Sequence, residues 1–339
     1  MARRPSNRRQ PQPPRPSRPP RDVYRYGIGE WFGEFFAVMS AQRRKELAER
    51  QLLPRRDRAP ILCPFQSYGG SQVPCNKESG VCTIREYRKD GATGNVEVAT
   101  GPSGSLRTVC PQRFVESGTI FQWIGETILR HPNPKVVDQV YFLQRVLDSA
   151  NTEEDPDFQD VGRIDHVLVH PVQPPFEWCA LEIQAVYFSG DSMGPEFTAI
   201  GQHTVEGIPF PVGRRRPDDR SSGPKRLMPQ LQTKVPSLRR WGKKMAVVID
   251  EGFFAALSRM EPVQHVSNCD IAWFVVKFTE REGRAILTRG AIHLTTLERS
   301  VEGLTGGDPV SREEFEARIR EKLGERPAPA VEPNLDGGQ

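Results

Sequence analysis

The sequence contains no uninterrupted run of about 18 apolar residues, which is the length that a membrane-spanning helix needs. Its basic, proline-rich N-terminus is not followed by an apolar segment, so an ordinary secretory signal peptide is not expected. No internal repeat is visible. These absences predict a soluble, unsecreted protein with no membrane partner.

Cysteine is scarce, with six residues in the chain, and none of them form a C-x-x-C pair. Four nevertheless fall within one loop-rich stretch, as Cys63, Cys75, Cys82 and Cys110. An unsecreted protein keeps thiols reduced, so metal ligation explains these four better than disulfides do. A tetrahedral site would supply the folding energy that this weakly apolar stretch lacks. All-sulfur coordination suits zinc or iron, and unrelated thiols are the alternative.

Acidic residues are few in two segments whose charge is strongly positive. Residues 1–22 hold seven arginines and one acid, and residues 211–244 hold eleven Lys and Arg against two Asp. Concentrated positive charge favours a polyanionic partner, because Lys and Arg release counterions from phosphates. The ordinary alternative is a solvated loop and a loose tail. We expect the internal segment to contact DNA, with the following candidates: Arg214, Arg215, Arg216, Arg220, Lys225, Arg226 and Lys234.

Hydrophobic periodicity predicts an α+β or α/β domain with a mixed sheet and flanking helices. Helices are expected at 28–53, 119–131, 138–150 and 311–323, the last with a Ser cap, and strands at 162–171, 178–188, 243–250, 271–280 and 285–298. The predicted organisation is a disordered arm (1–22), an N-terminal helix (23–56), a four-cysteine module (57–115), a catalytic core (116–322) with a basic loop (201–244), and a flexible tail (323–339).

The apolar run WCALEIQAVYF, at 178–188, predicts a buried strand, yet it places Glu182 and Gln184 on one face. Asp165 lies in an earlier strand pattern, GRIDHVLV, and prolines between the two indicate a tight return. Antiparallel neighbours would bring Asp165 and Glu182 together, and such a carboxylate pair needs a cation. Magnesium fits an oxygen-only site that also binds phosphate. The pattern predicts attack of water on a phosphodiester, with Gln184 orienting the water or a phosphate oxygen.

Other patterns leave alternatives open. GDSMG, at 190–194, matches G-x-S-x-G and predicts an α/β-hydrolase with Ser192 as nucleophile. Glu126 is a candidate third metal ligand from a helix against the sheet, and a solvent-facing glutamate is the ordinary alternative. If the carboxylates are incidental, the chain would be a non-catalytic four-cysteine DNA-binding regulator.

The combination of YGIGEWFGEFF, the four cysteines, GRIDH and ALEIQAVYFSG resembles the NotI-type restriction endonucleases over most of residues 23–320. The resemblance implies a PD-(D/E)XK nuclease core, a homodimer, and Mg²⁺-dependent cleavage of double-stranded DNA at a GC-rich palindrome. It further implies that the four cysteines carry iron. A place in the prokaryotic cytoplasm and the lack of a nucleotide cofactor are also implied by the resemblance. By position, Asp165 and Glu182 match the metal-binding carboxylates, and Gln184 stands where the wider superfamily has a lysine.

The expected function is therefore that of a type II restriction endonuclease that leaves 5′-phosphate and 3′-hydroxyl ends. Each subunit of a twofold dimer would cut one strand of a palindromic site. An uncharged amide such as Gln184 can orient water but cannot supply positive charge to the transition state, so the metal or another group must do so.

Overall fold

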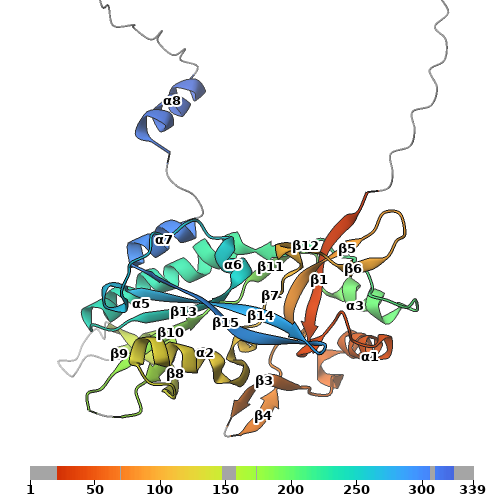
Figure 1. Ribbon diagram of the computed structural model, residues 1–339, viewed down its shortest axis with the longest axis horizontal. Helices are drawn as coiled ribbons and strands as arrows, with labels where there is room; N and C mark the ends of the chain where they lie inside the picture. Colours follow the sequence, from red (N-terminus) through yellow and green to blue (C-terminus); the bar gives the residue numbers. More distant parts are fainter. Residues whose placement is uncertain (1–20, 69, 147–157, 173, 306–309, 324–339) are drawn as a thin grey trace, which may run out of the picture.

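The computed structural model describes residues 21–68, 70–146, 158–172, 174–305 and 310–323. The predicted arm and tail lie almost entirely outside these ranges. Figure 1 shows a long mixed sheet that runs through the larger part of the molecule, with a smaller sheet beside it. Among the described residues, no helix has both the length and the apolar composition to cross a membrane.

The central sheet has six strands in the order β15-β14-β13-β10-β9-β8. Their bounds are β8 Lys135–Val146, β9 Phe158–Val169, β10 Trp178–Ile183, β13 Met245–Asp250, β14 Ile271–Arg281 and β15 Arg284–Thr295. Strands β10, β13 and β14 are parallel, whereas β8, β9 and β15 pair antiparallel with their neighbours. The sheet is therefore mixed, as the sequence predicts.

Helices cover both faces of this sheet (Figure 1). One face carries α2 (Thr119–Ile124) and the π-helical turn η4 (Gly125–Leu129), which pack on a cluster that includes Leu181 and Val248. The opposite face carries α5 (Met228–Arg240) and α7 (Leu297–Thr305), which pack on Ala180 and Val247. Successive strand residues alternate between the two cores, so the faces of β10 are distinct.

A second sheet has the order β2-β1-β5-β6, and β7 also pairs with β5. It consists of β1 Val23–Trp31, β2 Glu34–Phe35, β5 Val81–Lys89, β6 Val96–Val98 and β7 Arg107–Thr108. Two-stranded ribbons are formed by β3 (Leu62–Tyr68) with β4 (Ser71–Pro74) and by β11 (Tyr187–Gly190) with β12 (Arg215–Asp218). Helices α1 (Ala41–Leu52) and α3 (Gly194–Gly201) share the apolar core of this sheet.

The remaining elements are short or peripheral. They are η1 (Arg55–Asp57), η2 (Pro102–Gly104), η3 (Pro111–Gly118), α4 (Asp219–Ser222), η5 (Gly223–Leu227), α6 (Glu251–Ala255), η6 (Val266–Asn268) and α8 (Arg312–Lys322). Helix α8 begins after Ser311, whose side chain accepts from the Glu314 backbone N–H, so the predicted cap is confirmed.

The predicted helix at 28–53 is wrong in its first half. Residues up to Phe35 form the hairpin β1–β2, whose two turn residues, Phe32 and Gly33, both have positive φ (49° and 79°). Such a turn matches the twist of paired strands. Trp31, Phe32 and Phe36 are buried in one apolar cluster and Phe35 in another, so the spacing of these aromatic residues imitates that of an amphipathic helix. The helix itself begins only after Ser40, which caps it through the Arg43 backbone N–H.

Two further secondary-structure predictions are corrected. Residues 138–146 belong to strand β8, which pairs with β9 from Lys135 to Val146 with register shifts around Leu143. This pairing outweighs the helical spacing. Residues 147–150 lie outside the described ranges. The basic region 201–244, predicted as a loop, contains helix α5, in which Leu231, Val235 and Leu238 form a buried stripe. The cysteine module, predicted to be irregular, supplies β5 to the second sheet.

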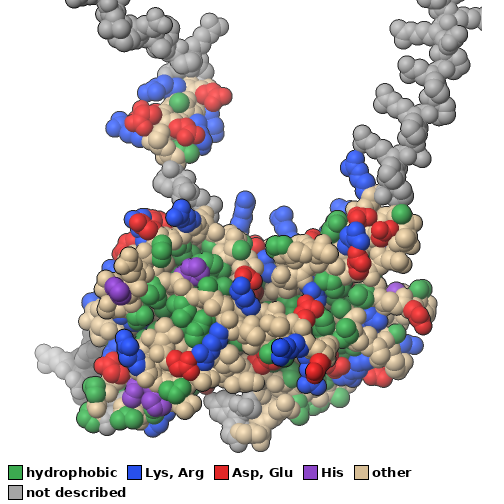
Figure 2. Space-filling model, in the orientation of Figure 1, with side chains coloured by type: hydrophobic (Ala, Val, Ile, Leu, Met, Phe, Trp, Pro, Cys, Tyr) green, Lys and Arg blue, Asp and Glu red, His purple; other side chains and the backbone are tan. Residues whose placement is uncertain are grey.

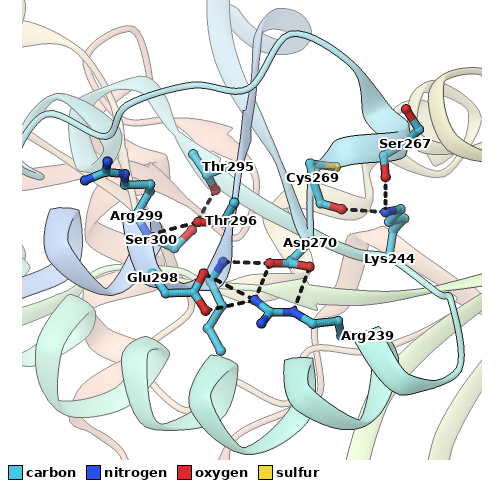
Figure 3. Close-up of polar contacts among 11 residues, drawn as sticks. Arg239, Lys244, Ser267, Cys269, Asp270, Thr295, Thr296, Glu298, Arg299 and Ser300 are labelled. Carbon is cyan, nitrogen blue, oxygen red and sulfur yellow. Dashed lines mark hydrogen bonds and ion pairs between the residues drawn. The ribbon is translucent and has the colours of Figure 1, made fainter.

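Helix α5 is held in place at its C-terminal end by a polar network (Figure 3). Arg239 donates to both carboxylate oxygens of Asp270, at 3.1 and 2.5 Å, and also pairs with Glu298 of α7 at 3.1 Å. Asp270 in turn accepts from the Leu297 backbone N–H at 3.0 Å. The network joins α5, the start of β14 and α7, and so fixes which residues of α5 face β10.

Candidate active site

The predicted meeting of Asp165 and Glu182 rests on the pairing of β9 with β10. These strands are antiparallel, and their register runs from Trp178 opposite Val169 to Leu181 opposite His166. Continued by one residue, this register would set Glu182 opposite Asp165, and helix α5 contacts Glu182 through Lys234. The two carboxylates interact, since the charge of Asp165 contributes to a raised pKa of Glu182.

The two carboxylates differ in their surroundings. The side chain of Asp165 is 45 % exposed and has Arg163 Nε at 3.7 Å. Glu182 is only 2 % exposed. Burial is the main reason why its pKa is raised, and the ammonium of Lys234 opposes that rise. The pair therefore joins a solvent-accessible acid to a buried one.

Lys234 reaches Glu182 from helix α5, which lies over this part of the sheet. Its Nζ donates to Glu182 Oε2 at 2.7 Å and to Gln230 Oε1, one helical turn earlier, at 2.7 Å. The side chain is 7 % exposed. The structure thus places Lys234 beside the carboxylates rather than on the DNA-contacting surface that we expected for it.

Gln184 follows the last residue of β10 and is also buried. Its backbone N–H donates to Val248 at 3.0 Å, and its side-chain Nε2 donates to the Ala185 carbonyl at 2.6 Å. The amide nitrogen is therefore engaged locally. Its position on the Glu182 face agrees with the alternation of the strand.

Glu126 lies elsewhere. It belongs to the π-helical turn η4, and its carboxylate accepts from Arg289 of β15 at 2.5 Å. The hydrogen bond with Arg289 lowers the pKa of Glu126. Strand β15 is separated from β10 by two other strands, so the structure does not bring Glu126 to the Asp165–Glu182 pair.

The four cysteines of the module lie on β3, after β4, on β5 and after β7. Cys63, Cys82 and Cys110 are buried and Cys75 is partly so. Burial raises the pKa of Cys75, and the charges of Cys63 and Cys110 add to the effect. The thiols are thus near enough to influence one another, and no disulfide joins them.

Among the described residues, no three or more His, Cys, Asp or Glu side chains form a group that could hold a metal ion. Lys77 lies close to three of the thiols and donates to the Val109 carbonyl. Burial lowers the pKa of Lys77, and nearby Cys110, Cys82 and Cys75 act in the opposite direction. Four thiols are a donor set that suits zinc or iron. In the described residues, however, these thiols are not gathered into a metal-binding group.

The remaining basic candidates fall into two groups. Arg215 is buried: its guanidinium contacts Glu196 Oε2 at 2.6 Å and the carbonyls of Asp191 and Ser192. That engagement makes it a structural residue. The others are exposed, namely Arg214, Arg216, Arg220, Lys225 and Arg226. Figure 2 shows acidic and basic side chains interspersed over one face, with Lys and Arg projecting from the edge above β11 and β12.

Ser192 does not occupy a nucleophile elbow. It follows β11, which pairs only with β12 in a two-stranded ribbon, and it precedes α3. An α/β-hydrolase nucleophile instead ends a strand of the central sheet. The residues of the G-x-S-x-G match instead connect β11 to α3, and the Ser192 carbonyl in this connection accepts a hydrogen bond from Arg215 at 2.6 Å.

Lys234 as a neighbour of Glu182 was missed by sequence reasoning, although a signal was present. It lies three residues after Leu231 and four before Leu238, inside the buried stripe of α5. A lysine within an apolar stripe of a helix indicates a buried partner of opposite charge.

A mixed sheet that places two interacting acids and a lysine on one face is an arrangement suited to phosphodiester chemistry. The sequence model of a family described as "Restriction endonuclease NotI" matches residues 46–287, which include the four cysteines, both carboxylates and Lys234. The protein is thus a restriction endonuclease by family. More particularly, the chain belongs to the NotI restriction endonuclease family. A search of curated proteins finds no match to this chain.

Proposed function

We propose that the protein is a Mg²⁺-dependent type II endonuclease that cleaves double-stranded DNA at a GC-rich palindrome and leaves 5′-phosphate and 3′-hydroxyl ends. The observation that supports the proposal most is the antiparallel pairing of β9 with β10, together with the influence of the Asp165 charge on the pKa of Glu182. The mixed sheet with helices on both faces is compatible with a PD-(D/E)XK core, which forms part of the proposal.

Asp165 and Glu182 fit the metal by the chemistry of their donors. Magnesium binds hard oxygen ligands, keeps several waters, and is usually held by one or two protein carboxylates together with substrate phosphate. When bound, the ion stabilises the negative charge that develops on the leaving 3′-oxygen. Glu126 is not part of this proposed set, because Arg289 engages it on another strand.

The chain's own residues set the geometry of the reaction. Asp165, being half-exposed, meets both solvent and DNA, whereas the buried Glu182 keeps a fixed orientation through its 2.7 Å bond to Lys234. The amide oxygen of Gln184 would accept a hydrogen bond from the attacking water and so direct it toward phosphorus. The side chains of the exposed arginines on β12 and α4 would contact phosphates or guanine edges.

The four cysteines are proposed to hold one structural metal ion, either iron or zinc. Support comes from their position in one module, from the burial of three of the thiols, and from their mutual effect on pKa. Such an ion would order the module that supplies β5 to the second sheet. Two subunits are proposed to form a twofold dimer, as a palindromic site requires.

The test is incubation of purified protein with plasmid and viral DNA in Mg²⁺. We expect discrete fragments whose ends ligate without further treatment, because ligation needs a 5′-phosphate and a 3′-hydroxyl. Asp165→Ala and Glu182→Ala should abolish cleavage and keep DNA binding. Intact but shifted DNA from the native chain would instead indicate a DNA-binding regulator, and cleavage by either variant would refute the assignment of the carboxylates.

A further inference from the structure

We propose that Lys234 supplies, from helix α5, the fixed positive charge of the cleavage site, in place of a cation at the Gln184 position. This inference rests on the proposed nuclease function and adds a third residue to its site. It starts from the two hydrogen bonds of the Lys234 ammonium, to Glu182 Oε2 and Gln230 Oε1, each at 2.7 Å.

The first argument is the location of the charge. Lys234 lies on the face of the sheet that carries both carboxylates, and its side chain is 7 % exposed. A lysine is almost never buried to this degree unless it is paired, and the partner of Lys234 is the proposed metal-binding Glu182. Within this water-excluded layer, a positive charge acts on nearby anions far more strongly than an exposed one does.

The second argument is that the ammonium is anchored independently of Glu182. Gln230 is four residues earlier on the same helix and gives Nζ a second acceptor that does not depend on Glu182. Helix α5 is itself fixed to the sheet by the Arg239–Asp270–Glu298 network. The charge therefore stays in position when the site is filled.

The third argument is spare hydrogen-bonding capacity. An ammonium has three N–H donors, and among the residues that the structure describes, the two bonds above are those that Lys234 makes to protein groups. The remaining N–H can donate to a non-bridging phosphate oxygen. Gln184 has no charge to offer, and its amide nitrogen already donates to Ala185.

The experiment compares single-turnover cleavage by native protein and Lys234→Gln at saturating Mg²⁺. Glutamine removes the charge and keeps a donor for Glu182. We expect the cleavage rate to fall about 100-fold or more, as when one stabilising donor is lost from an active site. Binding of Ca²⁺ to the DNA-free protein should not weaken, because both carboxylates remain and a neighbouring positive charge is lost. Binding of DNA in Ca²⁺ should stay within about threefold of the native value.

Lys277→Gln is the matched control. Lys277 also pairs with a glutamate at 2.8 Å, Glu251, but on an exposed surface, with half of each side chain accessible. It should cleave at the native rate. Lys234→Gln combined with Gln184→Lys restores one positive charge beside Glu182. The double variant should cleave at least tenfold faster than Lys234→Gln alone. This double variant also provides a folded reference if Lys234→Gln proves unstable.

Three results would overturn the inference. They are cleavage by Lys234→Gln within threefold of native, a loss of cleavage that merely follows a loss of Ca²⁺ binding, and absence of recovery in a folded double variant. Failure of the proposed function is distinguishable, because Asp165→Ala and Glu182→Ala would then also retain cleavage or the native protein would show none.

Discussion

Arg113 provides the strongest test of how the cysteine-bearing sheet is joined to the central sheet. It lies in η3, three residues after Cys110, and its side chain is completely buried. Its Nε contacts Glu30 Oε2 of β1 at 2.7 Å, and a terminal nitrogen donates to the Ala285 carbonyl of β15 at 2.8 Å. The guanidinium thus links β1 of the second sheet to β15 of the central sheet.

We predict that Arg113→Met lowers the free energy of unfolding by about 3–5 kcal/mol, the range for removing one partner of a buried ion pair. Glu30, which is 1 % exposed, would be left without its counter-charge. The guanidinium also lies between the rings of Phe65 and Phe278, with centroids at 4.4 and 4.6 Å, and those contacts are reduced. Urea unfolding followed by intrinsic fluorescence measures the loss.

The pH dependence gives an internal check. Burial raises the pKa of Glu30, and Arg113 opposes that rise. In Arg113→Met the folded state therefore binds the Glu30 proton more tightly than the unfolded state does, so the stability of the variant should increase as pH falls toward 5. The double variant Arg113→Met/Glu30→Met should be more stable than Arg113→Met. A loss below about 1 kcal/mol at pH 8 would refute the reasoning.

Three further outcomes follow from particular residues. Gly33→Ala should cost about 1–3 kcal/mol in a thermal or urea unfolding assay, because φ of +79° in the β1–β2 turn strains an alanine. Cys82→Ser should lower the iron or zinc content measured by elemental analysis, whereas Cys269→Ser, a buried thiol outside the module, should leave it unchanged. Arg216→Ala should reduce the slope of log DNA affinity against log salt by about 1, whereas Arg318→Ala on α8 should not. A metal-free native protein, or equal salt slopes for both arginine variants, would contradict the last two expectations.

The antiparallel pairing of β9 with β10 was predictable because it depends on local information. Alternation along β10 fixes the face of Glu182, and the prolines between the strands indicate a return that sets the antiparallel register. Strand β13 and helix α2 were likewise predicted. The first is a short continuous apolar run, and the second has apolar residues at three- and four-residue spacing.

The errors arose where a partner distant in sequence decides the structure. The aromatic residues near Trp31 have helical spacing. The segment up to Trp31 is nevertheless a strand, because it pairs with β5, some fifty residues later in the sequence. Strand β8 is extended because β9 pairs with it along its length. Propensity within either segment does not contain that information.

Lys234 illustrates the same limit at the site. Its charge grouped it with the exposed arginines of 211–244, whereas its place in the stripe of α5 buries it against Glu182. Arg215 was misplaced for a similar reason, since Glu196 on α3 engages it. Composition locates positive charge along a chain, and only the packing of helices on sheets separates surface charge from buried charge.

The central claim is that Asp165 and Glu182 bind one divalent ion between β9 and β10. Titration of Mn²⁺ into the DNA-free protein, followed by electron paramagnetic resonance, tests this directly, because Mn²⁺ accepts the same oxygen ligands as Mg²⁺. We predict one site per chain, weakened at least tenfold in both Asp165→Asn and Glu182→Gln and unchanged in Glu126→Gln. Native Mn²⁺ affinity in either of the first two variants would contradict the account.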